Sequence, residues 1–289
     1  MTTSTIFAGR AARLCAPWAS LGLAVLALAG CVSMGEVGGR RGAGVAEIDT
    51  GDPAAASANI ASLSDVIRAN PNDAAAYNTR GAAYARSGRF QEAVADFGRA
   101  IQLDSNPAPA YTNRGLAFRQ MGRNDAALAD FTKAIETQPN HAPAYLARAN
   151  LLRAQGQLDA ALGDLAQAIR LNPESAQAFH ARGLVHQARG DHQRAITDFD
   201  NAIDRDPFAG APYMARGQSY IAVGKNDAAV EDFNAALNVD NKQADAWAGL
   251  GLAYERQGNR VKASESYQRA LVVDASNRIA RDGAARVGR

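Results

Sequence analysis

The chain has 289 residues and is nearly neutral, with 31 basic and 29 acidic side chains. A neutral chain lacks the concentrated basic face that nucleic acid requires, so we expect no nucleic-acid partner. The four histidines, His141, His180, His186 and His192, stand in no metal-ligand spacing, and no Gly-x-Ser-x-Gly nucleophile motif is present. We therefore expect no metal, no cofactor and no catalytic residue.

Residues 1–30 have the pattern of a secretory signal peptide. Arg10 and Arg13 form a basic start, and the apolar run at residues 21–29 is too short to span the ~30 Å of membrane hydrocarbon. Removing this segment takes away two basic and no acidic residues, so the remaining chain is formally neutral.

The tetrapeptide Leu28-Ala29-Gly30-Cys31 ends this segment and resembles a bacterial lipobox. The resemblance implies that the signal is cut before Cys31, that Cys31 is lipidated, and that its acyl chains form a permanent membrane anchor. Val32, in place of aspartate, implies sorting to the outer membrane, facing the periplasm. The alternative is an uncleaved apolar tail whose cysteine is coincidental.

Residues 31–52 are expected to form a Gly-rich tether of about 25 Å between this anchor and the folded repeats. The piece Gly39-Arg40-Arg41-Gly42-Ala43-Gly44 is not a phosphate-binding loop, because no strand precedes it and no Gly-Lys-Ser/Thr follows. If Cys15 is lost with the signal and Cys31 is lipidated, as the resemblance implies, we expect no thiol to be left for disulfides, metal binding or redox chemistry.

Residues 53–73 predict a single capping helix. Asp52 suits the N-cap and Pro53 the first helical position, apolar residues recur at helical spacing up to Ile67, and Pro71 ends the helix. When it is shifted by 34 residues, this helix falls in register with the second helix of the repeats that follow. We interpret it as an N-terminal half-repeat.

The segment 74–277 repeats itself every 34 residues. Each block has an aromatic residue at position 4, Gly or Ala at position 8, Gly at position 15, Ala at positions 20 and 27, and Phe, Leu or Tyr at position 24. Positions 4, 8 and 11 share one stripe of a helix, and positions 20, 24 and 27 share a stripe of a second. The blocks are 74–107, 108–141, 142–175, 176–209, 210–243 and 244–277.

These spacings predict a helix-turn-helix hairpin in each block. Glycine at position 15 supplies a left-handed residue after the first helix, and Pro139, Pro173 and Pro207 stop the second helix in three blocks. The pattern resembles the tetratricopeptide repeat (TPR), which implies an all-α, right-handed TPR solenoid whose hairpins pack only on their neighbours. Residues 278–289 are expected to form a short, basic C-terminal capping helix.

A second pattern links positions 7 and 23 of each block. The first five blocks have Arg at position 7 and Asp at position 23, and the sixth changes both, to Leu250 and Ser266. Pairing between neighbouring repeats would leave Asp232 and Arg80 without partners, whereas pairing within repeats leaves no orphan. We therefore predict five structural ion pairs, Arg80 with Asp96, Arg114 with Asp130, Arg148 with Asp164, Arg182 with Asp198, and Arg216 with Asp232.

The resemblance also implies a concave groove lined by the first helices, into which positions 2, 5, 9, 12 and 13 project. Amides and arginines there suit an extended peptide backbone, and apolar residues suit an apolar side chain. The predicted peptide-binding residues are Asn78, Arg86, Thr112, Arg119, Asn150, Arg153, His180, Gln187, Gln218 and Arg256. The other groove positions include Ala82, Ala85, Leu116, Gln120, Leu146, Gln177, Leu184, Met214, Ile221, Asp245, Leu252 and Glu255.

Some TPR proteins grip a C-terminal carboxylate with lysine at position 5, and this chain has no lysine there. If a carboxylate is held, the predicted set is Asn150 with Arg119 and Arg153. The alternative is that these are surface arginines without a ligand. His180 is expected either to take part in binding or to be an ordinary solvated side chain.

Two classes of function follow from these expectations. The first is a non-catalytic scaffold, a lipoprotein that recruits protein partners to the envelope. It is similar to TPR lipoproteins that bring a cell-wall endopeptidase together with a periplasmic protease, and to others that help assemble pilus secretins or outer-membrane proteins. The second is a structural or self-associating lipoprotein that forms homo-oligomers, which exposed apolar residues on the convex face or in the last helices would favour.

Overall fold

The computed structural model describes residues 53–288, with side chains from residue 59 onward. Within this range the chain folds into fourteen α-helices and contains no strand. The predicted signal peptide, Cys31 and the tether lie outside the described residues. No helix of the described range is both long and apolar enough to cross a membrane.

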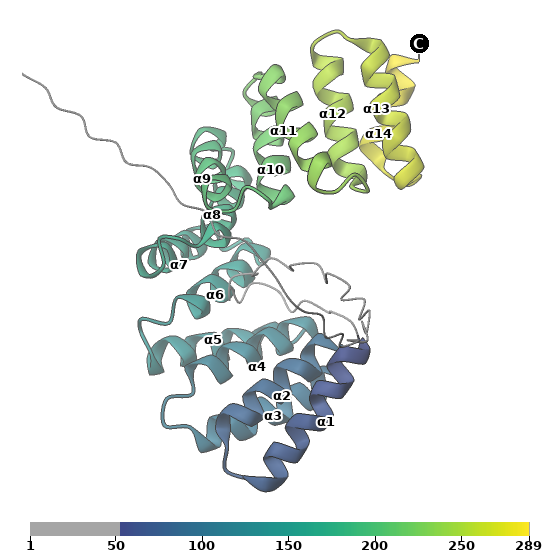
Figure 1. Ribbon diagram of the computed structural model, residues 1–289. Helices are drawn as coiled ribbons and strands as arrows, with labels where there is room; N and C mark the ends of the chain where they lie inside the picture. The colour runs from purple at the N-terminus through teal and green to yellow at the C-terminus, as the bar shows by residue number, and fades with distance from the viewer. Residues whose placement is uncertain (1–52, 289) are drawn as a thin grey trace, which may run out of the picture. The chain divides into compact units, whose positions relative to one another are not determined.

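Six helical hairpins follow one another along the chain, one for each 34-residue block (Figure 1). Helix α1 (Pro53–Ala69) precedes the hairpins and α14 (Arg278–Val287) follows them. The first helices of the hairpins are α2 (Ala74–Arg86), α4 (Ala108–Gln120), α6 (Ala142–Ala154), α8 (Ala176–Ala188), α10 (Gly210–Ala222) and α12 (Ala244–Arg256). The second helices are α3 (Phe90–Leu103), α5 (Asn124–Thr137), α7 (Leu158–Leu171), α9 (His192–Arg205), α11 (Asn226–Val239) and α13 (Arg260–Val273).

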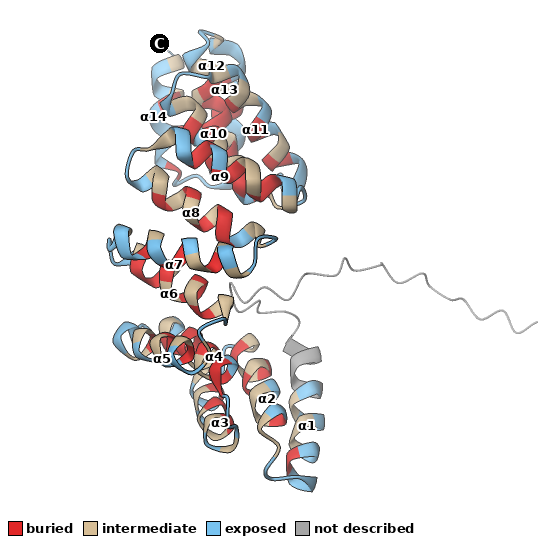
Figure 2. Ribbon diagram, turned by 90° about the vertical axis from the view of Figure 1, so that its left-hand side faces the viewer, coloured by how far each residue is buried: buried red, intermediate tan, exposed pale blue. Residues whose placement is uncertain are grey.

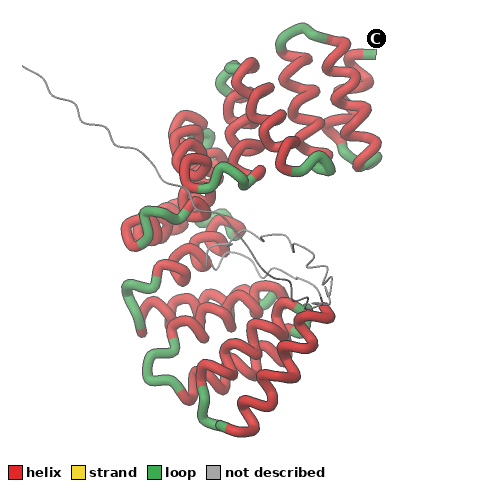
Figure 3. Tube along the Cα trace, in the orientation of Figure 1, coloured by secondary structure: helices red, strands yellow, loops and turns green. Residues whose placement is uncertain are grey.

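Every hairpin turns at the glycine of position 15, in the short loops that Figure 3 shows between the helices. The φ angles of these six glycines lie between 72° and 79°. This left-handed conformation is open to glycine because it has no Cβ. The second helices α5, α7 and α9 each end two residues before a proline. Both boundary signals predicted from the sequence are therefore confirmed.

The two helices of a hairpin pack through a contact between a glycine and a ring. A Cβ on Gly115 would lie 2.6 Å from Cε1 of Phe131, which is too close for two carbon atoms. Repeats 1, 4 and 6 show the same contact. Repeat 3 has Ala149 at this position, and there the facing residue is the smaller Leu165, whose side chain is fully buried. The two columns therefore change together because they share one volume.

Consecutive hairpins stack through the second helix of one and the first helix of the next. Successive first helices also contact each other, whereas no two successive second helices of the described range do so. The first helices therefore line the inner, more closely packed face of the stack. In Figure 2 the buried residues lie along the helix faces that are turned toward neighbouring helices.

Helix α14 caps the C-terminal end of the stack by docking on α12 and α13. Arg286 donates from Nε and Nη2 to the two oxygens of Glu255, at 2.7 and 2.9 Å, and the Tyr267 hydroxyl donates to the same carboxylate at 2.5 Å. Burial raises the pKa of Tyr267, and the Arg286 guanidinium lowers the pKa of Glu255. The expected C-terminal cap is thus held by a charged contact as well as by packing.

Candidate protein-interaction surface

The position-7 arginines brace each first helix against its own second helix. In five repeats the guanidinium donates from Nε and Nη2 to both oxygens of the position-23 aspartate, at 2.7 to 2.9 Å. These are the five pairs predicted from the sequence. The aspartate side chains expose no more than 11% of their surface. Such buried, bidentate contacts are stronger than exposed ion pairs.

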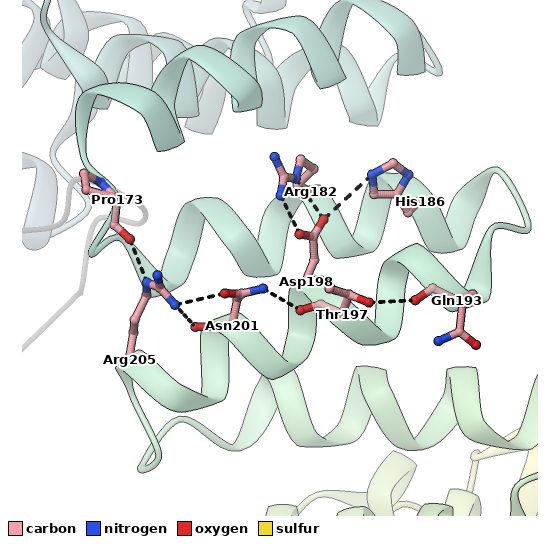
Figure 4. Close-up of polar contacts among 8 residues, drawn as sticks. All are labelled: Pro173, Arg182, His186, Gln193, Thr197, Asp198, Asn201 and Arg205. Atoms are coloured by element: carbon pink, nitrogen blue, oxygen red, sulfur yellow. Dashed lines mark hydrogen bonds and ion pairs between the residues drawn. The ribbon is translucent and has the colours of Figure 1, made fainter.

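Figure 4 shows this arrangement in repeat 4, where Arg182 and His186 both approach Asp198. The His186 Nε2 lies 3.8 Å from the carboxylate. Burial nevertheless lowers the His186 pKa, because desolvation outweighs the attraction of the aspartate. Beside this pair, Arg205 donates from Nε to the Pro173 carbonyl at 2.6 Å and so ties α9 to the preceding inter-repeat loop.

The third nitrogen of three of these arginines reaches the preceding repeat. Arg148 donates from Nη1 to the Thr132 hydroxyl at 3.2 Å, and Arg216 donates from Nη1 to Asp200 at 2.6 Å. Arg80 makes the corresponding bond to Ser64 of α1, at 3.1 Å. These inter-repeat bonds were not predicted from the sequence. The feature that could have indicated them is a polar residue at position 25 of the preceding block.

Three groove positions in repeats 2 and 3 are closed rather than open. Thr112 exposes 1% of its surface and donates to the Ala108 carbonyl at 2.9 Å. Leu116 and Leu146 are buried in the core. The expectation that these side chains project into a groove is wrong, because successive first helices pack closely enough there to cover them.

Two of the predicted amides bond to neighbouring repeats. The side-chain Oδ1 of Asn78 accepts from Nδ2 of Asn113 at 3.1 Å. Gln187 donates from Nε2 to the Ala215 carbonyl at 3.0 Å and to the Ser219 hydroxyl at 3.1 Å. Gln187 thus ties α8 to α10. The sequence feature that could have indicated this contact is Ser219, because the same position of the other five repeats is apolar.

Arg153 and His180 lie on successive first helices, α6 and α8. Burial, and secondly the positive charge of Arg153, lower the pKa of His180 to about 4, so its imidazole is neutral at pH 7. The His180 ring packs at a 49° tilt against the core ring of Phe199, with 5.8 Å between their centroids. His180 is therefore partly buried rather than simply solvated.

The other predicted groove residues are spread along the stack. Asn150 and Arg119 are partly buried, as is Arg86 in repeat 1, whereas Gln218 in repeat 5 and Arg256 in repeat 6 are exposed. The two acidic residues at groove positions of repeat 6 have partners within the chain, since Glu255 accepts from Arg286 and Asp245 accepts from Asn277 at 2.7 Å. The groove residues therefore do not form one compact site.

Two surface depressions lie away from this inner face, at turns between paired helices. One is lined by residues 122–126 and Gln155, and the other by residues 224–228 and Gln257. Each is formed by the start of a second helix and one side chain of the next repeat. No group of three or more His, Cys, Asp or Glu side chains that could hold a metal ion occurs in residues 53–288.

A stack of helical hairpins with polar side chains along its inner face defines an interaction scaffold, a class of protein that binds other proteins or peptides. The repeats identify the family. Profiles described as "Tetratricopeptide repeat" match residues 74–107, 108–141, 146–210 and 244–277, and one described as "TPR repeat" matches residues 217–258. The chain belongs to the tetratricopeptide repeat family, whose members are generally non-catalytic scaffolds.

Solved structures with the same fold share little sequence with this chain. The Cut9–Hcn1 hetero-tetramer of APC/C matches at a TM-score of 0.71 and 20% identity, over 83% of this chain and 47% of that one. This chain thus spans about half the length of that protein. Pseudomonas aeruginosa pilF matches at a TM-score of 0.67 and 16% identity, over 74% of this chain and 97% of pilF.

The TPR protein YrrB, described as having "an unusual peptide-binding site", matches at a TM-score of 0.54 and 24% identity, over 64% of this chain and 96% of YrrB. At these identities the likeness establishes the fold alone. A search of curated proteins found no match.

Proposed function

We propose that this protein is a non-catalytic scaffold that is anchored in the cell envelope by a lipid on Cys31 and binds partner proteins along its inner face. The proposal that partners bind along the inner face rests on the polar side chains that this face presents in repeats 3 and 4. Asn150 is partly exposed and makes no side-chain hydrogen bond within residues 53–288, whereas the Nε of Arg153, which also has no partner, is buried. A partner peptide would supply a hydrogen-bond partner for the Asn150 amide.

The anchoring part rests on the tetrapeptide that resembles a lipobox. We expect the Cys31→Ser variant to lose both metabolic labelling with a radioactive fatty acid and its place in the outer-membrane fraction. The chain offers a matched control, because Cys15→Ser removes the other cysteine and should leave both properties unchanged. Equal labelling of Cys31→Ser and the wild type would contradict lipidation at this residue.

Cross-linking in intact cells, followed by mass spectrometry, tests the binding part. We expect one or more envelope proteins to be enriched with the wild type and to be lost with an Arg119→Ala, Asn150→Ala, Arg153→Ala variant. Arg170→Ala, an exposed arginine on a second helix, is the control for lost charge. Partners that stay enriched with the triple variant would show that binding uses another surface.

A second candidate function, self-association, is favoured by exposed apolar side chains in the last three repeats and the C-terminal cap. Phe208, between α9 and α10, exposes 84% of its surface, and Val272, near the end of α13, exposes 88%. Val239 and Ile279 are also exposed. Light scattering after size-exclusion chromatography distinguishes the two functions, since a monomeric mass at all concentrations supports the adaptor. A dimeric mass that Phe208→Ser abolishes would favour self-association.

The partner also decides which pathway the scaffold serves. Cross-links to a cell-wall hydrolase and a protease would make it a recruiter of those enzymes. Cross-links to pilus, secretin or outer-membrane components would instead make it an assembly factor for such a complex.

A further inference from the structure

The position-7 arginines also reach the outer face of the stack, which the second helices form. Arg216 bonds to Asp232 on its own second helix and, through Nη1, to Asp200 on the preceding second helix. Arg148 and Arg80 do the same, with a hydroxyl on the preceding helix as the second partner. Each of these three guanidinium groups therefore lies between two successive helices of the outer face, with Nη1 directed at position 25 of the earlier one.

The other two arginines face a residue at position 25 that has no polar group. This residue is Gly98 where the arginine is Arg114. It is Ala166 where the arginine is Arg182. The Nη1 atoms of both arginines have no hydrogen-bond partner among the described residues, and neither atom is buried. Their side chains expose 24% and 27% of their surface, against 17% to 21% for the other three arginines.

The space beside these two Nη1 atoms is open. Apart from its own helix, a Cβ built on Gly98 would have one atom of the described residues within 4 Å, the Nη1 of Arg114 at 3.7 Å. One turn before Ala166 on α7, a Cβ on Gly163 would meet no such atom, and both residues are exposed. We call the space at Gly98 the first outer site and the space at Ala166 the second outer site.

The chain itself shows which groups fit such a space. Ser64 and Thr132 fill it with a hydroxyl at 3.1 and 3.2 Å, and Asp200 fills it with a carboxylate at 2.6 Å. The closest of these three bonds is thus the one to a charged acceptor, as expected for a guanidinium donor.

The charges around the two outer sites also favour an acidic ligand. Position 25 shares one stripe of its helix with positions 18, 22 and 29. On α3 these positions carry no carboxylate, and on α7 they carry one, Asp159, which is paired with Arg189. No carboxylate of these stripes is therefore left to repel an acidic group that enters the outer sites.

We infer that the two outer sites bind acidic side chains of a partner protein, in the space that Asp200 occupies beside Arg216. In each site the guanidinium keeps both bonds to its own aspartate and donates from Nη1 to one oxygen of the incoming carboxylate. A chain has a single C-terminus but can present two acidic side chains, so the pair of sites points to Asp and Glu. This surface is separate from the inner face and adds a second place at which the scaffold holds a partner.

Filling the first outer site from within the chain tests its geometry. Gly98→Asp puts a carboxylate at the position that Asp200 has in repeat 4, and Gly98→Asn is the matched neutral control with a similar helix propensity. We expect Gly98→Asp to unfold at a higher urea concentration than Gly98→Asn, because its carboxylate accepts from Nη1 of Arg114. Equal midpoints would show that this nitrogen does not hold a carboxylate, and would overturn the site.

Selection from a random peptide library tests whether a partner carboxylate binds there. Twelve-residue peptides displayed on phage are selected on the full-length wild type, and the clones are then tested on a Gly98→Asp, Ala166→Asp variant. We expect clones with Asp or Glu to bind the wild type and to be lost with this variant, because the new carboxylates occupy both outer sites. A Gln91→Asp, Gln102→Asp variant adds two charges at exposed positions of the same stripe of α3, and it should retain the clones.

The best clone is then synthesised as an amidated peptide, with and without its acidic residues changed to amides. Fluorescence anisotropy should show about 10- to 100-fold weaker binding when the recognised carboxylate is removed, and a similar loss with the Gly98→Asp, Ala166→Asp variant. Circular dichroism checks that this variant is folded.

The outcomes separate the outer sites from the inner face. Clones that all bind the Gly98→Asp, Ala166→Asp variant as tightly as the wild type, or lost clones without acidic residues, would overturn the outer sites. The Arg119→Ala, Asn150→Ala, Arg153→Ala variant, which tests the inner face, should retain the acidic clones. Loss of these clones with that triple variant would place their binding on the inner face and would also overturn the inference.

Discussion

The ion pair between Arg114 and Asp130 offers a sharp test of how the repeats are held together. Its two bonds are 2.7 and 2.8 Å long, and the side chains expose 24% and 8% of their surface. No bond from Arg114 to the preceding repeat complicates the pair, because position 25 there is Gly98. Repeat 6 contains a natural replacement, with Leu250 and Ser266 both buried and the Ser266 hydroxyl donating to the Lys262 carbonyl at 2.8 Å.

Removing one partner of a buried pair costs about 3 to 5 kcal/mol, because the other charge is left buried and unpaired. We expect Arg114→Leu to cost about 3 kcal/mol, the lower end of that range, because part of the site is open to water. Asp130→Ser should cost about 2 kcal/mol, since the arginine can turn toward solvent. The double variant recreates the arrangement of repeat 6, and we expect it to cost only about 1 to 2 kcal/mol. The resulting coupling energy is about 3 to 4 kcal/mol.

Urea denaturation followed by circular dichroism measures the four free energies of unfolding. Arg170→Leu, on the exposed surface of α7, is the control for the loss of an arginine. Hydrogen exchange of the α4 and α5 amides measures the stability of this repeat alone, which is needed because an array of repeats need not unfold in one step. A coupling energy below about 0.5 kcal/mol would refute the reasoning, because the pair would then behave like an exposed ion pair.

Four further predictions concern the ring contact, the inner face and the C-terminal cap. Gly115→Ala should lower the free energy of unfolding by about 1 to 3 kcal/mol, because its methyl meets a buried ring, and a second change, Phe131→Leu, should recover part of that loss in urea denaturation. Arg153→Ala should raise the His180 pKa above about 4 but keep it below the ordinary value of 6.5, since burial is the larger cause and persists. An unchanged His180 pKa in an NMR titration would contradict the electrostatic effect of Arg153 on the imidazole. The unfolded chain binds a proton at His180 near pH 6.5, and the folded chain binds it only near pH 4. The free energy of unfolding should therefore fall by about 3 kcal/mol as the pH is lowered from 6.5 to 4. The His180→Asn variant should lack this part of the pH dependence of unfolding. Arg286→Ala should speed amide exchange in α14 but not in α2, because it removes the charged contact that docks the cap; equal protection in both proteins would show that packing alone holds it.

Local features of the fold could be predicted from the sequence because they depend on neighbours within one repeat. The left-handed glycines, the helix ends before proline and the ring facing a small residue all involve residues of a single hairpin. The five ion pairs were also accessible, since the joint change to Leu250 and Ser266 in the sixth block distinguishes pairing within repeats from pairing between them.

The candidate site was harder to predict, because the surface of a groove depends on how neighbouring repeats are placed. Position 9 holds Leu116 in repeat 2, where it is buried, and Asn150 in repeat 3, where it is partly exposed. The sequence shows both as members of one column, and only the distance between successive first helices decides which is covered. The contact of Gln187 with the next repeat was hidden for the same reason.

The sequence by itself determined the helical hairpin, its period and its internal ion pairs, because a 34-residue unit repeated six times shows which residue types each position needs. Only the tertiary structure decided which inner-face side chains stay accessible and that His180 is neutral beside Arg153. The physical reason is that desolvation and unmet hydrogen bonds depend on atoms from adjacent repeats, and their distances are set by the packing of helices rather than by spacing along the chain.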